Sequence, residues 1–122
     1  MGETFLGFEG VYVGAAGTVT IPNVRGALEA IVISKDGATN NAARTVQIVA
    51  TMADGLTVTF GGPLAIGDGQ NIYHPRKQAL AADLTTGIAG VYDRYHLAGK
   101  VTFTVAAADS DDITRVRIIT EP

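Results

Sequence analysis

The chain has 122 residues, no cysteine, and a formal net charge of -3 from nine Lys and Arg against twelve Asp and Glu. This length predicts one domain over residues 1–122 with a single core, and the lack of cysteine excludes disulfides and thiolate metal sites. The charges are interspersed along the chain, so no basic surface for nucleic acid or anionic lipid is expected. Charged residues make up only 17% of the chain, which indicates that part of the surface contacts other protein.

The N-terminal segment lacks both a basic leader and an apolar run of signal length. Export is therefore not expected, and synthesis in the cytoplasm fits the sequence. No apolar stretch is long enough to cross a membrane. Residues 1–13 contain short apolar runs separated by glycines, a pattern that predicts an N-terminal arm or an edge strand.

The clearest element is a β-hairpin over Val46–Phe60, in which two alternating runs meet at an Asp-Gly pair. A two-residue turn there would mix apolar and polar side chains on each face. A three-residue loop, Ala53–Gly55, instead collects the apolar side chains on one face, and a one-residue slip would exchange the two faces. We therefore expect Gly55 at positive φ, and Ile48 and Val58 buried together.

The rest of the chain predicts further short strands. One segment differs, because Pro75–Leu84 starts with proline, consists of helix formers and spaces Leu80 and Leu84 four apart. This pattern predicts a short helix. The acidic segment Ala107–Asp112 predicts a solvated turn. The other expected strands are Thr18–Ile21, ended by Pro22-Asn23, then Leu28–Lys35, Gln70–His74, Val91–Leu97, Lys100–Ala106 and Ile113–Thr120.

These elements together define the fold class. About eight strands follow one another with turn signals at short intervals, and no long helical crossover is present to connect parallel strands. The pattern predicts an all-β fold, an antiparallel β-sandwich or jelly roll, with one short helical insertion near 75–84.

Few residues could support catalysis or metal binding. The only serines are Ser34 and Ser110, and neither lies in a nucleophile elbow. His74 and His96 with Asp93 would form a metal site if their strands paired. The simpler interpretation is that both histidines are surface groups near strand ends. We therefore expect no enzymatic activity, no cofactor and no metal.

One part of the sequence pattern is similar to a known class of proteins. Thr57–Leu64 leads through Gly67-Asp68-Gly69 into a long loop, followed by Val91–Tyr95, Lys100–Ala106 and a closing strand. This order resembles small β-sandwich virion proteins of tailed bacteriophages that decorate or cement the head shell. The resemblance implies a structural role in the virion, assembly as a homo-oligomer, most simply a trimer, and contact with the major capsid protein or other virion subunits.

The tyrosines suggest a second function, carbohydrate binding. Tyr73, Tyr92 and Tyr95 would suit a carbohydrate-binding β-sandwich module if their rings formed one exposed platform. In a sandwich, however, tyrosines more often lie at the edge of the core with the hydroxyl group in water.

Several strands are apolar on both faces, which predicts association between copies. If Leu28, Ala30 and Val32 face the core, Ile31 and Ile33 face outward. An exposed side chain of this size forgoes roughly 1.5–3 kcal/mol of burial, so a neighbouring subunit is expected to cover it. The expected interface residues are Phe5, Leu6, Phe8, Ile31, Ile33, Ile113 and Ile119.

Overall fold

The fold of the protein is all-β, as a computed structural model shows for residues 4–36, 44–67, 69–83, 85–108 and 112–122. No helix in these segments is long and apolar enough to cross a bilayer. The strands are β1 (Leu6–Val13), β2 (Gly17–Asp36), β3 (Thr45–Met52), β4 (Thr57–Thr59), β5 (Leu64–Ala65), β6 (Gly69–Tyr73), β7 (Arg76–Leu80), β8 (Gly87–Arg94), β9 (His96–Ala106) and β10 (Ile113–Glu121).

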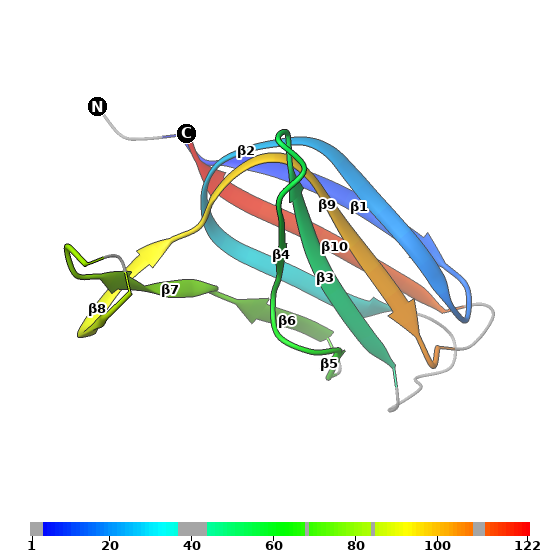
Figure 1. The fold of residues 1–122 in the computed structure, drawn as a ribbon. Helices are drawn as coiled ribbons and strands as arrows, with labels where there is room; N and C mark the ends of the chain where they lie inside the picture. Colours follow the sequence, from blue (N-terminus) through cyan, green and yellow to red (C-terminus); the bar gives the residue numbers. More distant parts are fainter. Residues whose placement is uncertain (1–3, 37–43, 68, 84, 109–111) are drawn as a thin grey trace.

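Strand β2 connects the two layers of a sandwich. Its first half pairs with β9, while its second half pairs with β10 and β6, all antiparallel. The sheet order β1-β10-β2-β9-β3-β4 therefore folds over on itself at the bend in β2 (Figure 1). One layer contains β1, β10, the second half of β2 and β6, and the other contains the first half of β2 with β9, β3, β4 and β5. The predicted antiparallel sandwich is confirmed.

The sequence predicted that a strand would end at Pro22-Asn23, but β2 bends there and continues. Pro22-Asn23 does not end the strand but produces a shift in register between Ile21 and Val24. Asn23 adopts a φ of 57° and Gly26 one of 109°. A Cβ atom at Gly26 would lie 2.8 Å from the Glu121 carbonyl oxygen, so a glycine is required where β2 passes β10.

The core lies between the two layers, and its composition corrects one prediction. Ile31 and Ile33 are not on the outer face: their exposed fractions are 1% and 0%. They belong to the same core cluster as Ile48 and Phe103 of the other layer. The prediction was wrong because the pairing of β2 with β10 shifts between Ile119 and Thr120, and this shift changes which residues of β2 face inward.

The hairpin of β3 and β4 has the predicted register. Thr51 pairs with Thr57, and the Met52 amide donates to the Leu56 carbonyl at 2.8 Å, so the loop is Ala53–Gly55. Gly55 has a φ of 92°. Ile48 is buried, and the half-buried Val58 packs against the same core.

The predicted helix over Pro75–Leu84 is wrong. Arg76–Leu80 is strand β7, which pairs with β8. Helix propensity is a weak preference, and the hydrogen bonds that β8 supplies override it here. Leu84 lies outside the described residues, as do Asp109–Asp111 of the predicted acidic turn.

Candidate functional site

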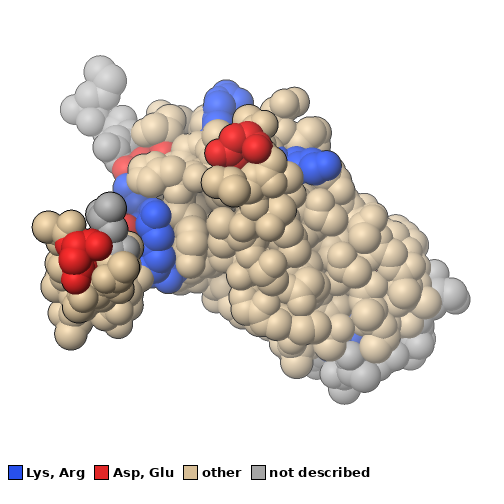
Figure 2. Space-filling model, viewed as in Figure 1, with Lys and Arg blue, Asp and Glu red and all other residues tan. Residues whose placement is uncertain are grey.

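Strands β7 and β8 form an arm, defined here as residues 76–94, that projects from the sandwich (Figure 1). The two strands make a sheet of their own, in which Arg76 pairs with Arg94 and Gln78 with Tyr92. In the space-filling view the arm stands apart from the body as a separate lobe (Figure 2). A two-stranded ribbon is marginally stable by itself, so its attachment to the sandwich and its contacts with other molecules decide how well it is ordered.

The arm carries large apolar side chains that the described part of the chain leaves about half exposed. Leu80, Ile88, Val91 and Tyr92 are 53%, 41%, 45% and 60% exposed. A group of large apolar side chains in water on a projecting element is typical of a surface that binds another protein.

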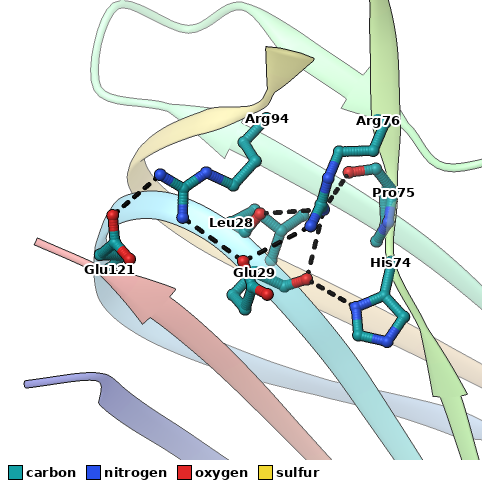
Figure 3. A network of polar contacts seen from close by, with 7 residues as sticks. All are labelled: Leu28, Glu29, His74, Pro75, Arg76, Arg94 and Glu121. Atoms are coloured by element: carbon teal, nitrogen blue, oxygen red, sulfur yellow. Dashed lines mark hydrogen bonds and ion pairs between the residues drawn. The ribbon is translucent and has the colours of Figure 1, made fainter. Parts of the chain in front are cut away.

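Arg94 connects β8, the second strand of the arm, to the sandwich. Its Nη2 donates a hydrogen bond of 2.9 Å to Glu121 Oε1, and its Nη1 lies 3.4 Å from Glu29 Oε2 (Figure 3). The hydrogen bond to Glu121, opposed by desolvation and assisted by both carboxylates, raises the pKa of Arg94 above its usual value. Strand β8 is thereby linked to β10 and to β2.

Arg76 connects β7, the first strand of the arm, to the same part of the sandwich, near Glu29. Its Nη1 donates to the carbonyl oxygens of Leu28, Glu29 and Pro75 at 3.3, 3.2 and 2.9 Å. His74 Nδ1 also lies 3.1 Å from the Glu29 carbonyl oxygen (Figure 3). Glu29 stands where the pairing of β2 with β10 skips a residue, between Leu28 and Ala30. The irregularity in β2 therefore provides the carbonyl groups that hold the base of the arm.

A cleft of about 480 Å³ opens beside the base of the arm. Its volume is within the range of binding pockets, roughly 300–1,000 Å³. The rings of Phe60 and Tyr95 meet edge to face with centroids 5.1 Å apart, and the Lys77 ammonium group lies 5.8 Å from the centre of the Tyr95 ring. Apolar and polar side chains both line the cleft, and the Lys77 cation lies beside it; among its lining residues are Ile31, Ile48, Phe60, Leu64, Tyr73, His74, Arg76 and Tyr95.

The three tyrosines considered for carbohydrate binding occupy two places. Tyr73 and Tyr95 line the cleft and are partly buried against the core. Tyr92 lies on the arm and is exposed. Two of the three rings therefore share a surface that could hold a ligand.

The residues expected at an interface are only partly available. Ile31 and Ile33 are excluded by their burial, as described above. Phe5 is 51% exposed, and the four others are half-buried on or beside the β1–β10 edge: Leu6, Phe8, Ile113 and Ile119. The sequence did not predict that the arm is a binding element. Val91 and Tyr92 lay within a predicted strand, but the alternation of side chains in that strand resembles that of any half-buried strand.

The two histidines do not form the metal site that was considered for them. His74 and His96 are both exposed. Among the residues that the structure describes, no group of three His, Cys, Asp or Glu side chains is placed to hold a metal ion. Ser34 is half-buried on β2, and Ser110 lies outside the described residues.

A second surface, the threonine face, covers the outer side of the layer that contains β3. It is formed by the residues that alternate with the core positions on β2, β9, β3 and β4: Thr18, Thr20, Thr45, Thr51, Thr57, Thr59, Thr102 and Thr104. Thr20 Oγ1 and Thr102 Oγ1 are 3.2 Å apart. Figure 2 shows this side as a broad uncharged surface, with charged atoms near its upper end and at the junction with the arm.

A scan against models of protein families and a search of curated proteins each found no match to this chain.

Proposed function

We propose that the protein is a structural subunit of a tailed-bacteriophage particle, a head decoration, cement or minor capsid protein, and that it has no enzymatic activity. It binds shell subunits, the major capsid protein first among them, through the β7–β8 arm. One observation carries the proposal: a projecting ribbon with four exposed apolar side chains is held at its base by ion pairs with Glu29 and Glu121.

The bracing of the arm matters for binding because ordering a flexible segment costs free energy. An arm that is already held in place by Arg76 and Arg94 loses less conformational freedom when it binds. Its two outer edges also leave backbone groups for pairing with a strand of the partner, and its alternating side chains provide specificity.

The assignment to a phage particle rests on the resemblance of Thr57–Leu64, Val91–Tyr95 and the closing strand to small virion proteins. The chain would be made in the host cytoplasm and end in the virion. Binding to nucleic acid or membrane is not part of the proposal, because the chain carries a net charge of -3 with both signs interspersed.

The alternative is a carbohydrate-binding module. Tyr73 and Tyr95 line the cleft together with His74 and Arg76, and this arrangement could stack on and hydrogen-bond to a sugar. A glycan array distinguishes the two functions: reproducible binding that is lost in Tyr73→Ala favours the module.

The test of the main proposal is co-expression of the chain with the shell protein encoded beside it, followed by gradient sedimentation. We expect the chain to sediment with assembled shells. A variant with a shortened arm, in which Asn-Gly replaces residues 79–91, should remain with the soluble fraction. This variant joins Gln78 to Tyr92, which are paired in the structure, by a two-residue turn suited to such a pair.

The matched control is Leu56→Ser, which removes a 68% exposed apolar side chain from the other hairpin tip. It should sediment with shells like the unaltered chain. Equal sedimentation of the shortened variant would refute the role of the arm, and absence of the unaltered chain from shells would refute the proposed function.

A further inference from the structure

We propose that the arm of one copy docks into the cleft of a second copy of this chain. The inference deepens the proposed function and rests on it only in treating the arm as a binding element: Leu80 and Ile88 near the tip dock on the second copy, and Val91 and Tyr92 nearer the base remain for shell subunits. The occupant of the cleft is thus a segment of the same protein, and the cleft is incomplete without the second copy.

An arm is not positioned to fill the cleft of its own chain. Arg76, which begins the arm, and Pro75 before it are themselves part of the wall of the cleft. From there the ribbon runs outward, away from the sandwich (Figure 1). The ties from Arg76 and Arg94 to Glu29 and from Arg94 to Glu121 hold it in that direction (Figure 3). The apolar surfaces of arm and cleft therefore stay apart within one copy.

The two surfaces match in apolar character. The arm presents Leu80 and Ile88, which lie near its tip and are half exposed. The cleft presents the exposed Ile72 and the half-buried Leu64 and Tyr95. Contact between the two would remove apolar area from water on both sides, which is the main favourable contribution in protein association.

The two surfaces also match in charge. Asp83 at the tip accepts hydrogen bonds from the Thr85 and Thr86 amides at 3.0 and 2.9 Å and from Thr86 Oγ1 at 2.6 Å. These donors lower the pKa of Asp83 to about 2, so the carboxylate keeps its charge. On the side of the cleft stand the cationic groups of Arg76 and Lys77. Opposite charges at arm tip and cleft favour this pairing and fix its register.

The arm extends well away from its base (Figure 1). The eight residues of β8 extend over roughly 26 Å at about 3.3 Å per residue. Because arm and cleft are different surfaces, the contact is heterologous, and repeated contacts close into a ring when the rotation between copies permits. A ring of three copies would be the homotrimer expected from the sequence.

The first test uses opposite charges in two separate chains, Asp83→Lys and Lys77→Asp, studied by sedimentation velocity. The unaltered chain should associate. Each variant alone should be less associated than the unaltered chain, because the opposite-charge pair of Lys77 and Asp83 is replaced by a like-charge pair. An equimolar mixture should be more associated than either variant alone, since each contact between the two variants pairs opposite charges. A monomeric unaltered chain at its highest soluble concentration, or a mixture no more associated than its components, would overturn the proposal.

The second test exploits the lack of cysteine in the chain. Ile88→Cys and Leu64→Cys are made in separate chains, mixed, and treated with a short bismaleimide cross-linker. We expect a cross-linked pair that contains one copy of each variant. The control mixture combines Ile88→Cys with Thr20→Cys on the threonine face and should cross-link far less. Equal yields from the two mixtures would overturn the proposal.

These outcomes separate the inference from the proposed function. Association is measured on purified chains without shells, whereas the proposed function is measured by sedimentation with shells. If the chains stay monomeric while the shortened arm still abolishes shell binding, the self-docking inference is wrong and the proposed function stands. If the chains associate but neither form sediments with shells, the proposed function is wrong and self-docking stands.

Discussion

Arg94 on β8 and Glu121 on β10 are joined by a hydrogen bond of 2.9 Å, which links the base of the arm to the last strand of the sandwich. Glu29 on β2 lies between this pair and Arg76 and interacts with both arginines at 3.4 Å. Three elements that are distant in sequence thus meet at one point. The orientation of the arm depends on this point, because the two strands of the ribbon otherwise pair only with each other.

The first prediction concerns this junction. Arg94→Gln should loosen the arm while leaving the sandwich folded, because the arginine bridges two carboxylates on two strands of the body. Limited proteolysis should cleave residues 76–94 faster than in the unaltered chain, and amide exchange should accelerate in β7 and β8 alone. The matched control is Arg117→Gln, which removes an exposed pair with Glu9 at 3.6 Å. Equal protection of the arm in both variants would refute the bracing role.

The second prediction concerns the loop of the β3–β4 hairpin. Gly55→Ala should lower the free energy of unfolding by about 1 kcal/mol, because a Cβ is disfavoured at a φ of 92°. No atom lies within 4 Å of the position that the Cβ would take, so the cost comes from the backbone alone. Gly62 also has open space around it, and Gly62→Ala is the control. Urea denaturation should show a clear decrease for the first variant and a smaller one for the second.

The hairpin was predictable because its signal is local. Alternation over Val46–Phe60 and an Asp-Gly pair determine both register and turn, without reference to the rest of the chain. The inward position of Ile31 and Ile33 was not predictable in the same way. It depends on a one-residue irregularity opposite Ile119 and Thr120, and an alternation pattern carries no sign of where a partner strand skips a residue.

The candidate site was harder to predict from the sequence than the fold. Pro75–Leu84 contains good helix formers, and only pairing with β8 makes its first half a strand. The sequence around Val91 and Tyr92 has the same pattern of apolar and polar residues as a strand within the sandwich. Their exposure follows from the direction in which the ribbon leaves the body, and that direction is set by Arg76 and Arg94 through contacts with distant residues.

The third prediction concerns a buried ion pair that the sequence did not indicate. Arg44 Nη2 lies 2.6 Å from Asp112 Oδ2, and both side chains are fully buried. Arg44 Nη1 also donates to the Ile113 carbonyl oxygen at 3.1 Å. Asp112 was expected in a solvated turn, but it anchors the start of β3 beside the start of β10.

Removing one partner of such a pair leaves a charge buried, which typically costs about 3–5 kcal/mol. Asp112→Asn and Arg44→Met should each destabilise the protein by an amount of that order in chemical denaturation. Combining Asp112→Asn with Arg44→Met should cost less than the sum of the two single changes, since no uncompensated charge remains. Strict additivity of the two single changes would contradict a direct interaction.

The fourth prediction concerns the two histidines. His74→Ala and His96→Ala should each stay within about 0.5 kcal/mol of the unaltered stability, because both side chains are exposed. His74 contacts only the Glu29 carbonyl oxygen among its described hydrogen bonds, and Arg76 also donates to that oxygen. Denaturation curves test the stability, and elemental analysis tests for metal. Loss of folding in either variant, or a stoichiometric transition metal, would refute this interpretation.

The fifth prediction concerns the ionisation of Asp83 at the tip of the arm. Its pKa is lowered from 3.8 to about 2, first by the hydrogen bond from the Thr86 side chain and then by the Thr86 and Thr85 amides. A carboxyl group whose pKa is depressed in the folded state stabilises that state above its unfolded pKa, and the contribution is lost as the pH falls through the folded value. The tip should therefore keep its order at all pH values above about 4 and lose it progressively as the pH falls toward 2.

An NMR titration of the Thr85 and Thr86 amides measures this ionisation directly. Thr86→Ala removes the hydroxyl donor at 2.6 Å but leaves both amide donors, so the midpoint should move upward, part of the way to 3.8. Asp83→Asn should abolish the titration of both amides, which identifies the group responsible. If the midpoint is unchanged in Thr86→Ala, the hydroxyl is not the main donor, and the tip is ordered by the backbone hydrogen bonds alone.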